Sequence, residues 1–205
     1  DGYLLIAQED KLVVFCQNSR LIERLREEIV RAPGQAINHY RLAVAAESSG
    51  LTDLAKQHLE ETIAKAKPGE TVDGRPLVEK VREHQYKIHI QVGSAARVKE
   101  DWDLAEKSFT KALTIAHEPR PRLRAGLDLA DAQERGGKSK DAVTTLQTLL
   151  RDPSLRSEQV DDLDGRRSLR ADLHLVDRLT AIMKKHGREP FAAHDREAAE
   201  TAADI

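Results

Sequence analysis

Apolar residues recur along most of the chain at the three- and four-residue spacing of amphipathic helices. Turn-forming residues interrupt this pattern at regular points, for example at Pro33-Gly34 and Pro68-Gly69. The pattern predicts helices at about 19–31, 36–48, 53–66, 76–99, 102–117, 121–135, 139–151 and 166–186. Because the connections between them are short, we expect consecutive helices to run antiparallel.

The beginning of the chain, DGYLLIAQEDKLVVFC, has a different pattern. Two apolar runs, at 3–7 and 11–16, flank the polar turn Gln8-Glu9-Asp10, which predicts a β-hairpin. Strands that are apolar throughout are covered on both faces, and a lone hairpin is at best marginally stable in water. Part of the surface that covers this hairpin should therefore come from elsewhere.

Three stretches of the helical region align without a gap on their turns: LAVAAESSGLTDLAKQHLEETI, VGSAARVKEDWDLAEKSFTKAL and LADAQERGGKSKDAVTTLQTLL. Each has a small residue near its start, an alanine after the turn, and a large apolar residue four positions later. The small residues are Ala43, Gly93 and Ala130, the alanines are Ala55, Ala105 and Ala142, and the large residues are Leu59, Phe109 and Leu146. Small residues let two helices approach closely, and we expect the large residue to fill the hollow between neighbouring units.

This pattern resembles the tetratricopeptide repeat family over roughly residues 36–153. The resemblance implies an all-α fold: a TPR-like right-handed helical-repeat solenoid, here with a short N-terminal β-hairpin stub. The alanine after the turn (Ala55, Ala105 and Ala142) recurs after 50 and 37 residues, whereas the family repeat has 34. Ala46, Ala96 and Gln133 also stand where the family usually has aromatics, so other two-helix solenoid families stay open.

The predicted organisation has four parts. A hairpin stub at 1–17 precedes repeats at 18–153, a C-terminal capping helix region at 154–187 and a frayed tail at 188–205. The helix at 166–186 has a broad apolar stripe, as expected of an element that covers the end of a solenoid.

Composition and charge exclude several classes of protein. The 33 Lys and Arg residues nearly balance 35 Asp and Glu, whereas a nucleic-acid binder usually has a basic excess. No apolar run reaches the ~18 residues of a membrane span. The single cysteine, Cys16, allows no internal disulfide and is predicted to be a buried, inert thiol. Since the chain begins with Asp1, we expect a fragment or processed product, and both cytoplasmic and periplasmic locations stay open.

Candidate chemistry is sparse. His84 and His89 lie about 140° apart on a helix and cannot share a metal ion, whereas His39 and His58 could approach each other from two helices. The stretch DDLDG at 161–165 lacks the other carboxylates of a calcium loop, and Gly136-Gly137-Lys138-Ser139 lacks the upstream glycine of a phosphate loop. The sequence therefore predicts no metal site, no cofactor and no enzymatic activity.

The family resemblance implies that the first helix of each unit lines a concave face, which accepts an extended peptide or a partner's helix. The partner-binding residues that it implies are Ile37, Tyr40, Val44, Glu47, Lys87, Ile90, Ser94, Arg97, Arg124, Leu127, Asp131 and Glu134. Tyr40 and Val44 stand where chaperone-tail binders of the family have a lysine and asparagine clamp, which disfavours that ligand class. The chain is predicted to be a protein–protein interaction scaffold with a groove of mixed character.

Two arginine groups could contact an acidic peptide, although neutralisation by nearby aspartates is the simpler interpretation. The groups are Arg120, Arg122 and Arg124, and Arg166, Arg167 and Arg170; the aspartates are Asp128, Asp131, Asp172 and Asp177. The rival function is action on nucleic acid, as in some other helical solenoids. It would need clustered aromatics, and the single tryptophan, Trp102, is predicted to pack.

The run LLIAQEDKLVVF resembles the closing strands of a blade in quinoprotein-like β-propellers. This resemblance implies a longer protein, a propeller followed by a solenoid, as in membrane-coat and bacterial membrane-coat-like proteins. The alternative function is therefore a structural part of such a coat, with peripheral membrane association through a larger assembly and self-association through the hairpin. A hairpin that only docks on the first helices stays open.

Overall fold

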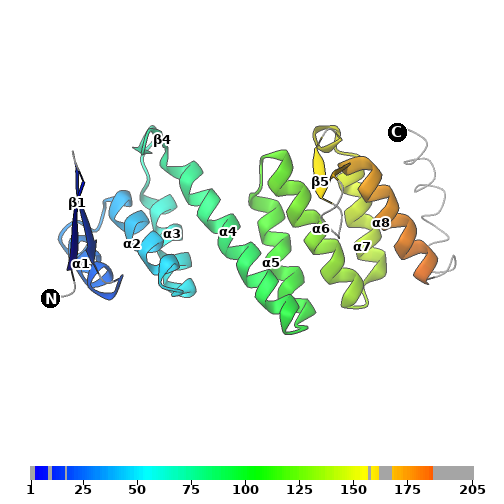
Figure 1. Cartoon of the computed structure of the whole chain (residues 1–205), viewed down its shortest axis with the longest axis horizontal. Helices are drawn as coiled ribbons and strands as arrows, with labels where there is room; N and C mark the ends of the chain where they lie inside the picture. Colours follow the sequence, from blue (N-terminus) through cyan, green and yellow to red (C-terminus); the bar gives the residue numbers. More distant parts are fainter. Residues whose placement is uncertain (1–2, 9–10, 17, 157, 162–167, 187–205) are drawn as a thin grey trace. The chain divides into compact units, whose positions relative to one another are not determined.

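The computed structural model describes residues 3–8, 11–16, 18–156, 158–161 and 168–186 (Figure 1). They form two compact units, Asp1–Ile88 and His89–Ile205, each described here by itself. The helices are α1 (Asn18–Arg31), α2 (Ala36–Ser48), α3 (Thr52–Lys65), α4 (Leu77–Val98), α5 (Trp102–Ile115), α6 (Pro119–Arg135), α7 (Ser139–Leu150) and α8 (Ala171–His186), with the 3-10 helix η1 (Pro153–Leu155). The predicted all-α fold is confirmed as a succession of helices, and helix α4 contributes residues to both units.

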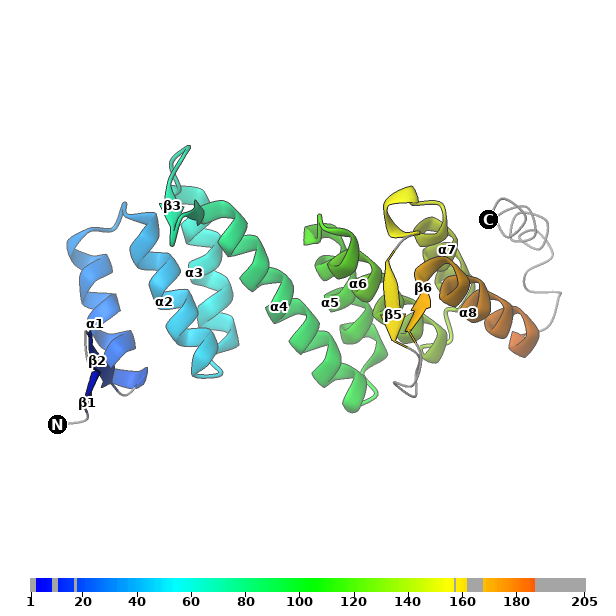
Figure 2. The same ribbon diagram turned by 45° about the horizontal axis from the view of Figure 1, so that its top comes forward.

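The first seven predicted helices end within two residues of the observed bounds. The predicted start of the last helix, at 166, is wrong, because Ser168–Arg170 form strand β6 and α8 begins only at Ala171. Strand β6 pairs antiparallel with β5 (Gln159–Asp161), and Figure 2 shows this hairpin beside α6 and α8. The predicted tail at 188–205 and the acidic turn at 162–165 lie outside the described residues.

The predicted N-terminal hairpin is confirmed as β1 (Tyr3–Gln8) and β2 (Lys11–Cys16). The strands pair antiparallel from Tyr3 opposite Cys16 to Gln8 opposite Lys11. Over the part of the chain that the structure describes, this sheet has two strands and no third one. Its origin in a propeller stays a prediction.

A second small hairpin lies in the segment before α4 and consists of β3 (Thr71–Val72) and β4 (Arg75–Pro76). Its turn residues, Asp73 and Gly74, both have positive φ, 51° and 75°. Positive φ at both central residues is the requirement of a type I′ hairpin turn, for which Asp-Gly is a preferred pair. This turn lies in a segment that the sequence pattern indicated only as a loop.

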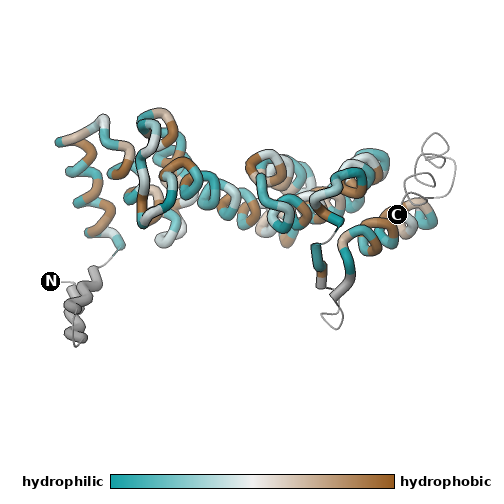
Figure 3. Tube along the Cα trace, turned by 90° about the horizontal axis from the view of Figure 1, so that it is seen from above, coloured by the Kyte–Doolittle hydropathy of each residue, from teal (hydrophilic) through white to brown (hydrophobic). Residues whose placement is uncertain are grey.

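In unit 1, the helices α1, α2 and α3 bury a core of aliphatic and small residues. Ile22 and Leu25 of α1 pack with Leu42 and Ala45 of α2. The repeat residues Ala43, Ala55 and Leu59 are also buried. Figure 3 shows apolar and hydrophilic positions alternating along these helices, as expected when one face of each helix is covered.

In unit 2, close helix approach depends on two glycines. A Cβ at Gly93 of α4 would lie 2.6 Å from Cε1 of Phe109 in α5, and a Cβ at Gly126 of α6 would lie 2.6 Å from Cδ1 of Leu149 in α7. The large repeat residue Phe109 was predicted to fill the space between neighbouring units. Its fully buried ring lies against the small residue of its own helix pair, where glycine leaves room for it. The predicted filling of the space between units stays a prediction.

Replacing Gly93 by alanine should therefore lower the free energy of unfolding by up to about 2 kcal/mol. Overpacking costs about 1–3 kcal/mol, and the better helix propensity of alanine returns about 1 kcal/mol of it. Urea unfolding of the variant measures the loss. Gly34→Ala is the matched control, because no atom lies within 4 Å of its added methyl group. Equal midpoints for the two variants would show that Phe109 can move aside.

The C-terminal core of unit 2 joins α7, η1 and α8 through buried residues that include Leu146, Leu155, Leu175 and Leu179. In α8, Leu175, Leu179 and Ile182 are buried, whereas Leu173 is exposed. Val176 and Met183 also pack against this core, so most of the predicted apolar stripe is covered and Leu173 lies outside it. No described helix is long and apolar enough to cross a membrane.

Candidate functional site

In unit 1, four polar side chains link α2 to α4. His84 Nδ1 donates to Glu47 Oε2 over 2.5 Å, and the Tyr40 hydroxyl lies 3.2 Å from His84 Nε2. Lys87 Nζ lies 2.7 Å from Glu47 Oε1. When a neutral His84 donates a hydrogen bond from Nδ1 to the carboxylate, its Nε2 can accept a hydrogen bond from the Tyr40 hydroxyl. This group therefore forms a continuous line of polar contacts between the two helices, from Tyr40 through His84 and Glu47 to Lys87.

Burial and neighbouring charges shift the pKa values of Glu47 and Tyr40 in this group. Burial raises the pKa of Glu47, but the hydrogen bonds and positive charges of Lys87 and His84 outweigh it, and its pKa lies below the usual value. Burial, followed by the charges of Asp73, Glu83 and Glu47, raises the pKa of the Tyr40 phenol. The carboxylate thus stays ionised and the phenol protonated at neutral pH, as the hydrogen bonds require.

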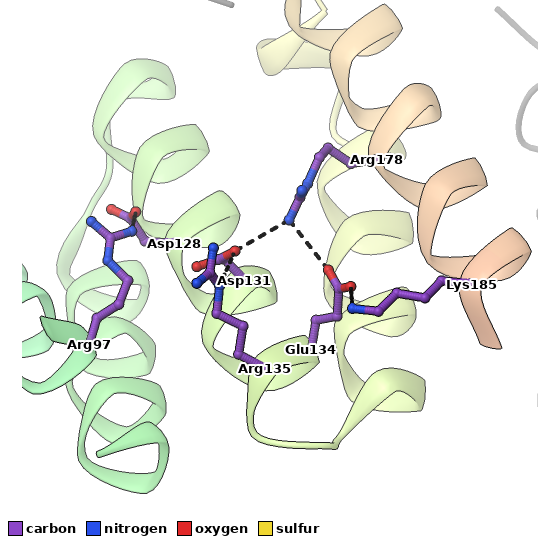
Figure 4. A network of polar contacts seen from close by, with 7 residues as sticks. All are labelled: Arg97, Asp128, Asp131, Glu134, Arg135, Arg178 and Lys185. Carbon is purple, nitrogen blue, oxygen red and sulfur yellow. Dashed lines mark hydrogen bonds and ion pairs between the residues drawn. The ribbon is translucent and has the colours of Figure 1, made fainter. Parts of the chain in front are cut away.

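In unit 2, an acidic row on α6 contacts the helices on both of its sides (Figure 4). Asp128 accepts from Arg97 Nη1 of α4 at 3.1 Å. Glu134 contacts Lys185 Nζ of α8 at 2.8 Å and Arg178 Nη2 at 3.5 Å. The third member, Asp131, lies 3.5 Å from Arg178 and 3.1 Å from Arg135 of its own helix. Spacing of three residues puts these carboxylates on one face of α6.

Beside this row lies a surface hollow of about 530 Å³ between α4, α6 and β5. Its lining residues are Arg97, Arg120, Leu123, Arg124, Leu127, Asp128, Gln159 and Val160. Leu123 is buried, and Leu127 and Val160 are half-buried, which gives the hollow an apolar surface. Three guanidinium groups and one carboxylate belong to it, so its lining has positive net charge.

The three arginines of the hollow differ in what they contact. Arg97 is paired with Asp128, and Arg120 with Glu158 at 3.1 Å. Arg124 is exposed and makes no hydrogen bond or ion pair with any described residue. Burial raises the pKa of Asp128, although Arg97 and Arg124 act in the opposite direction. Arg124 is therefore the cation of this hollow that can take up an external anion without breaking an existing contact.

The twelve predicted partner-binding residues have different environments. Arg97, Arg124 and Leu127 line the hollow, and Tyr40, Glu47 and Lys87 belong to the polar group of unit 1. Ile90 is buried, and Ile37, Val44 and Ser94 are half-buried. Asp131 and Glu134 face α8 through Arg178 and Lys185. Partner binding by these residues stays a prediction, and the hollow is the place where three of them converge.

Several residues of the site were not found from the sequence. Arg178 and Lys185 lie more than forty positions from their α6 partners, and β5 was not predicted at all. The spacing of Asp128, Asp131 and Glu134 was the available signal for an acidic row on one helix face.

The predicted neutralisation is confirmed for Arg120, Arg122 and Arg170, but not for Arg124, which pairs with no described residue. Arg122 pairs with Asp152 at 2.7 Å, and Arg120 with Glu158, both from the segment after α7. The predicted neighbour Asp172 does pair with Arg170. Arg166 and Arg167 lie outside the described residues.

Other predicted features have clear positions. Trp102 begins α5 and is half-buried, with the Arg135 guanidinium 5.8 Å from its ring centroid, so its packing role is confirmed. His39 and His58 do meet, with 3.0 Å between their Nδ1 atoms. Over the described residues, no group of three or more His, Cys, Asp or Glu side chains could hold a metal ion.

No protein-family model and no curated protein matches this chain. Among solved structures, the crystal structure of MamA protein is similar at 21% identity and a TM-score of 0.38. The match covers 65% of this chain and 62% of the MamA chain, so it spans less than two thirds of that protein. A likeness of this size does not bear on function.

Proposed function

We propose that this chain is a non-enzymatic protein–protein interaction scaffold, and that its hollow between α4, α6 and β5 binds a partner's peptide or helix. The segment that fits carries a carboxylate close to an apolar side chain. The observation that carries this proposal is the exposed guanidinium of Arg124, which pairs with none of the described residues, beside the apolar surface of Leu123, Leu127 and Val160.

Binding of a partner segment requires its apolar side chain and its carboxylate to make their contacts together. Burial of one Leu-sized side chain contributes about 1.5–3 kcal/mol, and a hydrogen bond to a charged group about 1.5–3 kcal/mol. Association costs at least about 4 kcal/mol in lost freedom of motion. Neither contact alone offsets that cost, so a peptide with only acidic or only apolar residues should bind poorly.

The lining of the hollow favours binding over catalysis. Its polar groups are arginines, a glutamine and Asp128, whose carboxylate is already held by Arg97. Neither a histidine nor a nucleophilic hydroxyl or thiol lines the hollow, whereas nucleophilic or acid–base chemistry usually places such groups together. The formal net charge of -2 supports a protein partner over a nucleic acid.

A 12-residue peptide library selected on the full chain tests the proposal. Enriched peptides should carry Asp or Glu within two positions of Leu, Ile or Phe. Affinities of the best peptides, measured by isothermal titration calorimetry, should fall at least tenfold for Arg124→Glu and for Leu127→Asp. Arg41→Glu, at an exposed arginine of α2 in unit 1, is the control and should bind normally. Basic consensus peptides, or peptides whose affinity ignores Arg124, would contradict the proposal.

The second proposal is a structural part of a propeller–solenoid coat. Its support is the β1–β2 hairpin, a complete antiparallel pair with no further strand beside it among the described residues. The hollow supports the first proposal more directly, because it combines the Arg124 guanidinium with an apolar surface.

A further inference from the structure

A pair of histidines joins α2 to α3 inside unit 1, away from the hollow. Nδ1 of His39 lies 3.0 Å from Nδ1 of His58, and the ring centroids are 5.2 Å apart. On its other side, His39 Nε2 lies 3.3 Å from the carbonyl oxygen of Pro33 in the α1–α2 turn. His39 is only 5% exposed, whereas His58 is half-buried. The pair thus connects three segments through one buried ring.

The contacts determine which nitrogen atoms carry protons. A carbonyl oxygen can only accept, so His39 carries its proton on Nε2 and donates to Pro33. Nδ1 of a neutral His39 is then an acceptor, and His58 must donate to it from its own Nδ1. A first additional proton can occupy Nε2 of His58 and leave every contact intact. A second additional proton can bind only at Nδ1 of His39, where it would face the Nδ1–H group of His58.

The surrounding charges act on the protonation of His58 in both directions. Arg26 of α1 and Lys65 of α3 are the cations that act on His58, and Glu61 of α3 is the anion. Glu61 is itself hydrogen-bonded to Lys65, which reduces its attraction for a proton on the ring. Burial, and then the charge of His39, lower the pKa of His58 below its ordinary value of 6.5.

We propose that the His39–His58 pair is a proton-sensitive latch, which holds α3 and the α1–α2 turn to α2 at neutral pH and releases them when both rings are protonated. This proposal is independent of the hollow. The ligand is the proton, and the device differs from a packing contact because protonation of the second ring places two N–H groups against each other and breaks the contact.

The sign of the pH effect follows from proton linkage. The folded-state pKa of His58 is lowered, so the unfolded chain binds more protons below pH 6.5. The stabilisation is therefore fully present above about pH 6.5 and is lost as the pH falls toward the folded-state pKa. A difference of one bound proton changes the opening equilibrium by up to tenfold per pH unit.

Amide hydrogen exchange of α2 and α3 between pH 7.5 and 5.5, corrected for the intrinsic rate, measures the latch. Wild-type protection should fall up to tenfold per pH unit below pH 6.5. His58→Gln keeps a donor for His39 Nδ1 but cannot be charged, so its protection should stay level. His117→Gln, at an exposed histidine between α5 and α6, should behave as wild type. Both variants retain His84, so any pH dependence of its contact with Glu47 is common to all three proteins.

Imidazole nitrogen shifts of the wild-type chain provide a second measurement that does not depend on a variant. At pH 7.5 they should show protons on His39 Nε2 and His58 Nδ1, followed by two coupled titration steps. The proposal is overturned if the two rings titrate independently near pH 6.5, or if His58→Gln keeps the wild-type pH dependence of exchange.

Discussion

Replacing Phe109 by alanine should lower the free energy of unfolding by about 3–5 kcal/mol, because a fully buried aromatic side chain is lost and a cavity remains. The ring lies against Gly93, whose missing side chain leaves nothing to fill the space. Urea unfolding followed by circular dichroism measures the change. Leu104→Ala, at an exposed position of the same helix, should cost less than about 1 kcal/mol. A loss below about 1 kcal/mol for Phe109→Ala would show that the α4–α5 contact is not part of the core.

The same site allows a double-mutant cycle. The other two repeats combine alanine at the small position with leucine at the large one, as in Ala43 with Leu59. Gly93→Ala should therefore cost much less in a Phe109→Leu background than in the wild type, since the shorter side chain leaves room for the methyl group. An unchanged cost in both backgrounds would assign the Gly93 effect to the backbone instead of the ring.

Reversing the charge of Glu134 should loosen α8 from α6 and lower the free energy of unfolding by about 2–3 kcal/mol. In Glu134→Lys, the side chain at a position only 11% exposed would face Arg178 and Lys185 without an anion between them. The expected loss is below the about 3–5 kcal/mol of a fully buried pair, because Lys185 is 63% exposed. Urea unfolding and hydrogen exchange in α8 measure the effect.

Two further variants define what the Glu134 result means. Glu134→Gln removes the charge without reversing it and should have a smaller effect. Glu60→Lys, an exposed charge reversal in α3, should change stability by less than about 0.5 kcal/mol. If Glu134→Lys unfolds like the Glu60 control, the contacts of α6 with α8 are carried by apolar packing alone.

Most helix bounds could be predicted because their signals are local. Apolar periodicity and residues such as Pro33 and Gly50 define where a helix can begin and end without knowledge of the rest of the fold. The start of α8 could not be predicted in this way. Ser168–Arg170 fit a helical pattern in sequence, but their pairing with β5 in space makes them a strand. The Asp73-Gly74 turn did carry a local signal, which the loop-like composition around it obscured.

For the candidate site too, the sequence could place some residues, whereas other contacts depend on how distant segments pack. The family resemblance implied that Arg97, Arg124 and Leu127 lie on one face, and the structure does place all three around the hollow. The contacts of Asp131 and Glu134 with α8, and the contribution of Val160 to the hollow, depend on where distant segments pack. Sequence spacing carries no information about those distances.

The alternation of charge across unit 2 has a consequence for how this array could grow during evolution. Helix α6 presents carboxylates, while its neighbours α4 and α8 answer with Arg97, Arg178 and Lys185. A tandem duplication of the α6–α7 pair would bring one acidic row against an identical one, without the cations that α4 and α8 supply. Lengthening by copying that pair would therefore need compensating charge changes at the same time. The charge pattern therefore opposes changes in the number of helices by simple duplication within the gene.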